Sequence, residues 1–211
     1  MAAIHVKVCG LTRTEDVAAA VTRGAWAVGF VVWPGSPRFV TLSKLRDLTA
    51  DVPAGVKRVG VAVNPDLDDV RRWRDEAGVT TLQLHGGEDV APFLSLGMDI
   101  FKAVSLEADD DVERAAALPA EVTVLVDAHD PVRLGGTGNR ADWARAATLS
   151  RRRPVILAGG LRAENVEEAI VQVSPWAIDV SSGLESEPGI KDHAKLARFF
   201  AMLRADGGPG L

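Results

Sequence analysis

Short apolar runs alternate with amphipathic stretches along almost the whole chain. A Val/Ile/Leu-rich run, a loop and a segment with apolar residues at helical spacing recur eight times. We expect strands at about 4–9, 26–32, 56–63, 80–84, 99–104, 122–127, 154–158 and 176–180. We expect helices near 13–23, 42–50, 66–77, 88–96, 109–118, 140–150, 162–172 and 190–204. Strands that alternate with helices in this way predict an α/β fold with a parallel sheet.

The evenness of this repeat favours closure of the sheet. No linker, low-complexity tract or change of composition interrupts it, so we predict a single-domain (β/α)8 barrel over residues 1–205. An open doubly wound sheet is the alternative. Residues 206–211 read Asp-Gly-Gly-Pro-Gly-Leu and are expected to form a flexible tail.

Local signals predict where individual helices begin and end. Thr12 followed by Glu15 fits a capping box that opens the first helix. Asn64 followed by Pro65 fits an N-cap and the first helical position. The glycines expected in the left-handed conformation after a helix are Gly24, Gly78 and Gly97.

Composition excludes several classes of function. A net charge of -5 argues against a nucleic-acid partner, which needs clustered positive charge. A single cysteine cannot form an internal disulfide, which favours a cytoplasmic location, and no apolar run is long enough for a membrane span. The four histidines have no metal-ligand spacing, so no metal is expected.

Candidate chemistry begins with Cys9, at the end of the first expected strand. The carboxyl ends of parallel strands form the edge where α/β sheets and barrels carry their active sites. A small buried hydrophobic residue is the alternative reading of this cysteine. Two long loops, 33–40 and 128–139, leave strands at the same edge and indicate that this rim handles a ligand.

Small residues at the ends of the last two strands indicate an anion site. Gly159 and Gly160 follow the seventh strand, and Ser181, Ser182 and Gly183 follow the eighth. Backbone N–H groups of such loops, with a short helix after the eighth strand, bind a phosphate without needing a lysine. Each glycine could instead only make a tight turn.

Asp127 ends the sixth strand, where a carboxylate terminates an apolar run. It precedes a glycine loop at 135–138 that includes Gly136, and such a loop can close over a substrate. A carboxyl shielded from water has a raised pKa, as a general acid at neutral pH requires. Capping of the loop by Asp127 is the alternative.

Lys7 and Asp179 are expected to pair, because the first and last strands of a closed barrel are neighbours and both residues face its interior. The positive charge would lower the pKa of the Cys9 thiol. A Schiff-base role for Lys7 is the minor alternative.

Three more residues belong to the expected rim. Arg38, between Pro37 and Phe39, is suited to grip a planar carboxylate, although most arginines are solvated surface charges. Gln83 and His85, at the end of the fourth strand, are expected to be polar binding residues, with catalysis by His85 as the minor alternative. Asp142 and the tryptophans are expected at a helix start or in the core.

These motifs, in this order, resemble the phosphoribosylanthranilate isomerase family over nearly the whole chain. The residues that carry the resemblance are Lys7-Val8-Cys9-Gly10-Leu11-Thr12, Ser36-Pro37-Arg38, Gln83-Leu84-His85-Gly86, Val126-Asp127-Ala128, Gly135-Gly136-Thr137-Gly138, Leu157-Ala158-Gly159-Gly160-Leu161, Asp179-Val180-Ser181-Ser182-Gly183-Leu184-Glu185 and Pro188-Gly189-Ile190-Lys191-Asp192. One departure is Ala62, where a phenylalanine is expected.

The resemblance implies the isomerisation of N-(5′-phosphoribosyl)anthranilate to 1-(2-carboxyphenylamino)-1-deoxyribulose 5-phosphate in tryptophan biosynthesis. By its match to the family, Asp127 is the general acid and Cys9 the general base. Arg38 would contact the anthranilate, while Gly159, Gly160 and the turn at Ser181, Ser182 and Gly183 would hold the phosphate. No cofactor is needed for these proton transfers, and a monomer is expected.

Two rivals are open at this point. The related histidine-pathway isomerase, or an enzyme that serves both pathways, would have an aspartate in place of Cys9 and a second phosphate site half a barrel away. A non-catalytic phosphosugar-binding barrel would bind phosphate without turnover.

Overall fold

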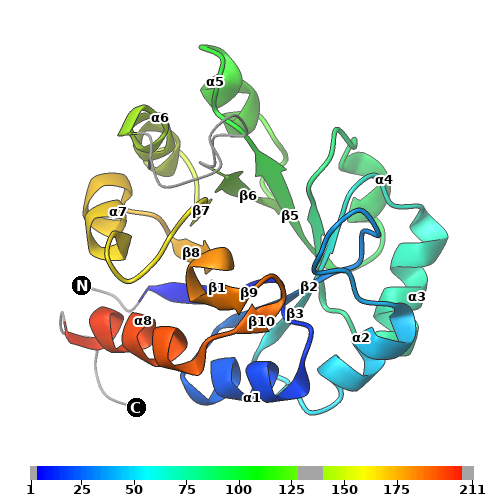
Figure 1. Ribbon diagram of the computed structural model, residues 1–211. Coiled ribbons are helices and arrows are strands. Elements are labelled where there is room, and N and C mark those ends of the chain that lie inside the picture. Colours follow the sequence, from blue (N-terminus) through cyan, green and yellow to red (C-terminus); the bar gives the residue numbers. More distant parts are fainter. Residues whose placement is uncertain (1–3, 128–139, 206–211) are drawn as a thin grey trace.

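Eight parallel strands close into a barrel in sequence order, as the computed structural model shows for residues 4–127 and 140–205 (Figure 1). The strands are β1 (His5–Val8), β2 (Ala27–Val31), β3 (Lys57–Ala62), β4 (Thr81–Leu84), β5 (Asp99–Val104), β6 (Val122–Asp127), β7 (Val155–Ala158) and β8 (Ala177–Val180). The predicted closed barrel is therefore confirmed, and the open sheet is not what forms.

Helices surround the barrel and follow the strands as predicted (Figure 1). They are α1 (Thr14–Thr22), α2 (Leu42–Thr49), α3 (Leu67–Ala77), α4 (Ala91–Leu94), α5 (Asp111–Ala116), α6 (Arg140–Ser150), α7 (Val166–Val173) and α8 (His193–Ala205). Helix α7 begins later than expected, at Val166, after a turn in which the Asn165 side chain accepts a hydrogen bond from the backbone N–H of Arg162.

Two short elements follow β8. A 3₁₀ turn, η1 (Ser182–Leu184), leads into a small antiparallel hairpin of β9 (Glu185–Glu187) and β10 (Ile190–Lys191). The short helix after the eighth strand is thus confirmed as η1. The hairpin was missed, because two- and three-residue strands are too short to display a hydrophobic period.

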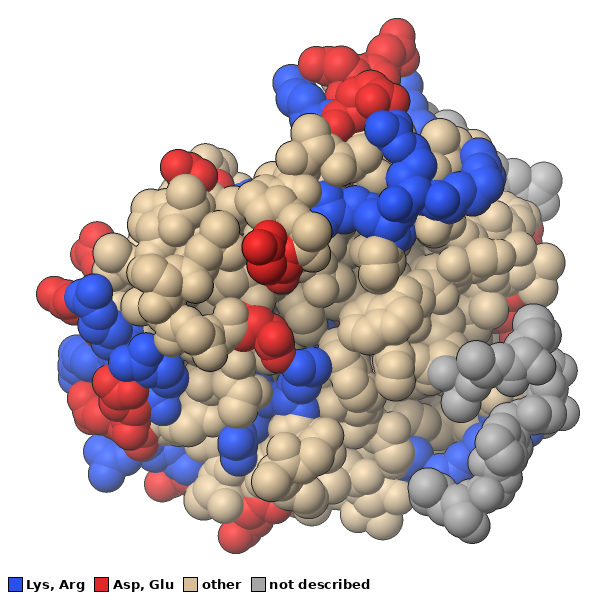
Figure 2. Space-filling view, turned by 180° about the vertical axis from the view of Figure 1, so that it is seen from behind, with Lys and Arg blue, Asp and Glu red and all other residues tan. Residues whose placement is uncertain are grey.

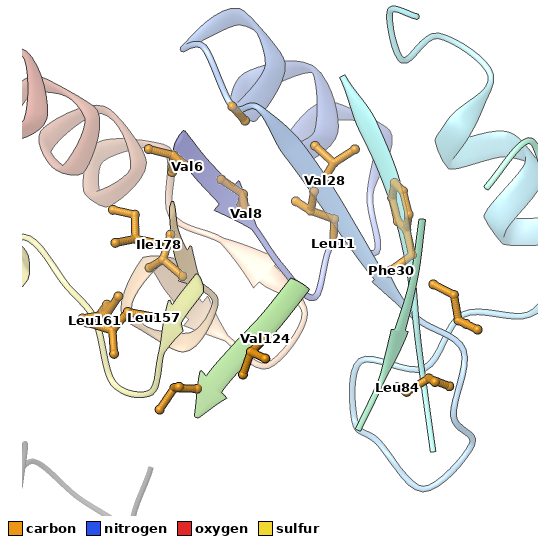
Figure 3. Packing of buried hydrophobic residues seen from close by; sticks show 14 of the residues in the cluster. Val6, Val8, Leu11, Val28, Phe30, Leu84, Val124, Leu157, Leu161 and Ile178 are labelled. Atoms are coloured by element: carbon orange, nitrogen blue, oxygen red, sulfur yellow. The ribbon is translucent and has the colours of Figure 1, made fainter. Parts of the chain in front are cut away.

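Strand alternation separates two cores. Val6 and Val8 of β1 pack outward into the large cluster between sheet and helices, part of which Figure 3 shows. Cys9, one position on from Val8, belongs instead to a smaller cluster inside the barrel, with Phe101 and Leu125 among its members. Successive residues of a strand thus face alternately the helices and the barrel interior, as the two-residue period of a strand requires. Ala62, where a phenylalanine was expected, packs in the outer cluster, so this departure does not widen the barrel interior.

Two predicted caps are wrong. Arg13 is the N-cap of α1, and the Thr12 hydroxyl donates instead to the carbonyl of Gly189 at 2.5 Å, which ties the start of α1 to the hairpin. Asp66 is the N-cap of α3, while Asn64 lies outside the helix with a φ of +47°. The predicted glycines are confirmed: Gly24, Gly78 and Gly97 all have positive φ.

No helix within 4–127 and 140–205 is long and apolar enough to cross a membrane. The same residues contain no group of three or more side chains that could hold a metal ion. The expected tail at 206–211 lies outside the described residues.

Candidate active site

Cys9 lies directly after β1, at the carboxyl end of the barrel. Its backbone N–H donates to the carbonyl of Val180 at 2.9 Å, and its side chain is buried with 8% exposed. Gly29 of β2 leaves the space for it: a Cβ at Gly29 would lie 2.9 Å from Cys9 Sγ and 3.2 Å from Lys7 Cε. A glycine on the neighbouring strand therefore makes room for both the thiol and the lysine inside the barrel.

Lys7 and Asp179 form the predicted ion pair, with Nζ 2.7 Å from Oδ2, where β1 pairs with β8. Burial disfavours the charged lysine, but the Asp179 carboxylate outweighs it and raises the pKa of Lys7. The Asp179 Oδ1 atom is buried and has no hydrogen-bond partner among the described residues. An ammonium bonded in this way is protonated and is no nucleophile, which disfavours the Schiff-base alternative.

The expected lowering of the Cys9 pKa is wrong. Burial raises the pKa of the Cys9 thiol, and the Lys7 ammonium only partly offsets this. The sequence placed a positive charge near the thiol correctly, but it could not show that the sulfur is almost wholly removed from water. In the free protein the thiol is therefore predominantly protonated at neutral pH.

Asp127 is the last residue of β6 and lies on the inner side of the strand. Leu125, two positions earlier, packs inside the barrel with Phe101, so strand alternation directs Asp127 the same way at the rim. His85 Nε2 lies 3.5 Å from Asp127 Oδ2. The almost fully buried Gln83 contacts the other ring nitrogen of this histidine, with its Nε2 3.3 Å from His85 Nδ1.

The expected phosphate loops are in contact. A Cβ at Gly183 would lie 2.0 Å from the carbonyl oxygen of Leu161, so the loop after β8 can approach the loop after β7 only because residue 183 is glycine. Gly159 and Gly160 both have positive φ, at 91° and 61°. Among the described residues the N–H groups of Gly160 and Gly183 donate to no protein acceptor, which leaves donors for an anion. Ser182 lies in η1, within the loop after β8, and the Ser181 hydroxyl donates to the carbonyl of Cys9 at 3.0 Å.

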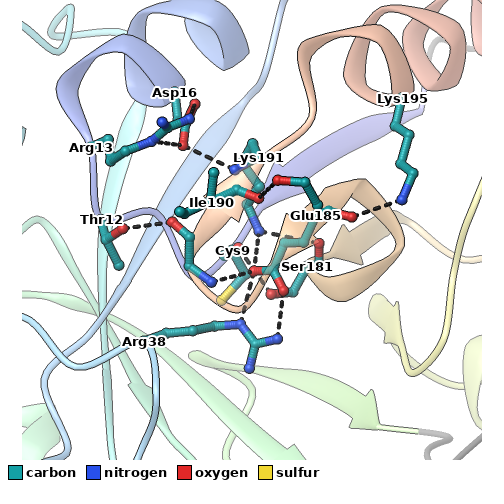
Figure 4. Close-up of polar contacts among 12 residues, drawn as sticks. Cys9, Thr12, Arg13, Asp16, Arg38, Ser181, Glu185, Ile190, Lys191 and Lys195 are labelled. Atoms are coloured by element: carbon teal, nitrogen blue, oxygen red, sulfur yellow. Dashed lines mark hydrogen bonds and ion pairs between the residues drawn. The ribbon is translucent and has the colours of Figure 1, made fainter.

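Arg38 lies at this rim, and a carboxylate of the protein itself holds it. Its Nε donates to Glu185 Oε1 at 2.8 Å and its Nη2 to Glu185 Oε2 at 2.6 Å (Figure 4). The carboxylate raises the pKa of Arg38. Arg38 thus binds a carboxylate, as its sequence context indicates, but this carboxylate belongs to Glu185 of the same chain.

Glu185 and Lys191 are the residues that sequence reasoning missed here. Both are buried in the hairpin, with Lys191 Nζ 2.8 Å from Glu185 Oε1. Burial lowers the pKa of Lys191 despite this carboxylate. Burial alone would raise the pKa of Glu185, but Arg38 and Lys191 outweigh it and lower it. Only the motif Glu-Ser-Glu-Pro-Gly-Ile-Lys could have signalled a hairpin with two charges facing inward.

Other predicted residues fall in different places. Gly136 and the loop at 128–139 lie outside the described residues, as does the side chain of Asp142. Trp143 is buried as expected. The core assignment is wrong for Trp33 and Trp176, which are 42% and 39% exposed. The Trp33 ring covers Gly35 at the rim, while Trp176 packs against His5 and Trp26 near the starts of the strands.

Comparisons with known proteins agree on one family. The family model described as N-(5′phosphoribosyl)anthranilate (PRA) isomerase matches residues 6–202. The N-(5′-phosphoribosyl)anthranilate isomerase of Chromohalobacter salexigens is 43% identical, with 94% of this chain and 93% of the relative aligned. The enzyme of the same name from Pseudomonas fluorescens is 41% identical, with 97% and 100% aligned.

Solved structures agree as well. Phosphoribosyl anthranilate isomerase from Thermotoga maritima superposes with a TM-score of 0.87 at 35% identity, covering 96% of this chain and 99% of that one. A phosphoribosyl anthranilate isomerase in complex with reduced 1-(o-carboxyphenylamino)-1-deoxyribulose 5-phosphate superposes with a TM-score of 0.84 at 34% identity, with the same coverage. The chain therefore belongs to the N-(5′-phosphoribosyl)anthranilate isomerase family.

Proposed function

We propose that Cys9 and Asp127 carry the proton transfers by which this isomerase of tryptophan biosynthesis acts. The reaction converts N-(5′-phosphoribosyl)anthranilate to 1-(2-carboxyphenylamino)-1-deoxyribulose 5-phosphate. The observation that carries the proposal is that a thiol and a carboxyl group end two inward-facing strand positions at one rim of the barrel. We propose further that the chain acts as a monomer in the cytoplasm.

Two anion sites would orient the substrate. The backbone N–H groups of Gly160 and Gly183, in the loops after β7 and β8, have no acceptor within residues 4–127 and 140–205 and are suited to the phosphate. The Arg38 guanidinium is suited to the anthranilate carboxylate. Buried acceptor atoms with no partner among the described residues, Asp179 Oδ1 and Gln83 Oε1, are suited to the sugar hydroxyl groups between them.

Asp127 opens the sugar ring. As general acid it protonates the furanose ring oxygen, the bond from that oxygen to C1′ breaks, and the aniline nitrogen lone pair forms an iminium at C1′. His85, 3.5 Å from Asp127, and Gln83 behind it orient the carboxyl group. This step makes no use of a cofactor, because it needs only a proton and the electron pairs of the substrate's own bonds.

Cys9 then removes the proton from C2′. The iminium acidifies this C–H bond, and its positive charge beside the barrel interior favours the thiolate over the thiol. The electrons of the broken C–H bond form the C1′–C2′ double bond of an enolamine. The enolamine takes a proton at C1′, releases the proton of its C2′ hydroxyl group to solvent and becomes the ketone. The Cys9 thiol, whose pKa is raised in the free protein, thus releases its proton to solvent once the cation has formed, and the thiolate is the base.

Anthranilate fluorescence of the substrate provides the test. We expect turnover by the native chain, and a loss of at least about a hundredfold in kcat for both Cys9→Ser and Asp127→Ala, as removal of a general acid or base requires. Binding of the reduced product analogue should be retained in both variants.

The rival binding protein predicts a different result. It requires phosphate affinity in the native chain with no isomerisation. Full turnover in both variants would instead remove Cys9 and Asp127 from the mechanism while leaving the family assignment intact.

A further inference from the structure

Among the residues that the structure describes, the Arg38 guanidinium bonds through one of its two hydrogen-bonding edges, and the other edge has no partner. The two bonds to Glu185 use Nε and Nη2, which is the side edge of the fork. The end edge, formed by Nη1 and the second N–H of Nη2, remains for a second planar carboxylate. Figure 4 shows this end of Arg38 pointing away from Glu185.

Glu185 is itself fixed from behind. It is 7% exposed and also accepts from Lys191 Nζ at 2.8 Å and from the backbone N–H of Gly189 at 3.3 Å. Lys191 donates in addition to the carbonyl of Ser181 at 3.1 Å. The Glu185–Lys191 pair therefore joins Arg38 to the turn that is suited to the phosphate.

The stem of Arg38 crosses Gly10, where a Cβ would lie 2.5 Å from Arg38 Cδ and 2.9 Å from Ser181 Oγ. Gly10 follows Cys9 directly, so the guanidinium is placed beside the proposed catalytic thiol. Without Glu185, a long side chain in a surface loop would sample several rotamers and lose this placement.

We infer that Glu185 is a positioning residue that aims the open edge of Arg38 at the carboxylate of the aromatic half of the substrate. The inference rests on the proposed function. Glu185 does not touch substrate: its carboxylate orients the fork, and Lys191 keeps that carboxylate in register with the phosphate turn. Because of this link, the site should prefer a substrate whose carboxylate and phosphate lie at one fixed separation.

Glu185→Gln tests the inference, because it keeps the shape but puts an N–H donor or a neutral oxygen against the guanidinium. Glu187→Gln, an exposed position in the same short strand, is the matched control. Two ligands are compared: the reduced product analogue, which has both the carboxylate and the phosphate, and ribulose 5-phosphate, which has only the phosphate.

We expect Glu185→Gln to lower the affinity for the reduced product analogue and to raise KM, each by about tenfold. This is the loss of affinity that one misplaced charged hydrogen bond causes. The affinity for ribulose 5-phosphate and kcat should change by less than about threefold, and Glu187→Gln should match the native chain. In a protein that already has Arg38→Ala, adding Glu185→Gln should cause no further loss of affinity for the analogue.

Equal losses for both ligands would make Glu185 a merely structural residue and overturn the inference, as would unchanged affinities for both. Glu185→Asp keeps the negative charge for Lys191 but shortens the reach to Arg38. It should also lose affinity for the analogue and not for ribulose 5-phosphate, and it replaces Glu185→Gln as the test if that variant does not fold. A native chain without isomerase activity would contradict the proposed function, whereas the two affinities judge Glu185 separately.

Discussion

At the scale of single residues, the site depends on where small side chains allow large or charged ones to lie. Gly29 gives Cys9 and Lys7 their space, and Gly10 gives Arg38 its path. The identity of Cys9 and Asp127 as candidates could be predicted from the sequence, because each ends an apolar run. The pKa direction of Cys9 could not, because it depends on burial by neighbours that come from other strands.

The raised thiol pKa leads to a direct prediction. The chain has one cysteine and no tyrosine, so ultraviolet absorbance of a thiolate reports Cys9 without interference from tyrosinate. We expect no thiolate at pH 7 in the folded protein, and titration only above the ordinary thiol value of about 8.5.

Unfolding supplies the control for this titration. In urea at about pH 9 the thiol should lose its proton more readily than in the native protein, so absorbance should increase on unfolding. Cys9→Ser should show neither signal. A thiolate signal in the native protein at pH 7 would mean that Lys7 outweighs burial.

At the scale of elements, the strands and helices could be predicted almost throughout, as could a short helix after the eighth strand, but the hairpin that follows it could not. Each strand and each long helix has its own hydrophobic period, whereas η1 and the β9–β10 hairpin have none. The hairpin nevertheless supplies Glu185 and Lys191, which join Arg38 to the turn after β8. The two predicted caps, at Thr12 and Asn64, are wrong for a related reason. Tertiary contacts, and not the neighbouring helix, determine the conformation of these two residues.

The close approach of the last two strand loops predicts a large effect of one methyl group. Gly183→Ala would put its Cβ 2.0 Å from the Leu161 carbonyl oxygen, so one loop must move. We expect a loss of about 1–3 kcal/mol in unfolding free energy and at least about tenfold weaker inhibition by inorganic phosphate.

Gly87→Ala is the matched control for this variant. Gly87 follows β4, nothing lies within 4 Å of a Cβ there, and we expect both quantities to stay near those of the native protein. Unchanged phosphate inhibition in Gly183→Ala would argue against a phosphate site in these loops. Urea unfolding and inhibition kinetics give the two quantities.

At the scale of the whole molecule, the pairing of β1 with β8 brings the two ends of the sequence into one site. Asp16 of α1 extends this link outward: it is fully buried and accepts from Arg13, from the backbone N–H of Lys191 and from His193 Nε2. On the face opposite to that of Figure 1, basic side chains lie beside acidic ones (Figure 2). Arg152, which follows α6, forms an ion pair with Glu113 of α5.

Asp16 predicts how stability depends on pH. Burial alone would raise its pKa, but the hydrogen bonds from Arg13, Lys191 and His193 outweigh burial and lower it. The unfolded chain then binds a proton at this residue more readily than the folded one. Its stabilisation is therefore present above the ordinary aspartate value of about 3.9 and is lost as pH falls through the lower folded value.

Asp16→Asn should remove this contribution to the pH dependence of the unfolding free energy. We expect it to lower the unfolding free energy by about 1–3 kcal/mol at pH 7 and to flatten the pH dependence of unfolding below about pH 4. Asp47→Asn, at an exposed position of α2, is the control. An equally steep acid transition in Asp16→Asn would show that other carboxyl groups govern it.

The most direct measurement of the proposed mechanism is a crystal structure of this chain with the reduced product analogue bound. We predict that Cys9 Sγ lies about 3–3.5 Å from C2 of the sugar. We also predict that the Asp127 carboxyl group lies within hydrogen-bond reach of the hydroxyl oxygen that comes from the opened ring. The phosphate should lie on the N–H groups of Gly160 and Gly183. An analogue whose C2 faces away from the sulfur, or whose phosphate lies on other loops, would contradict the account.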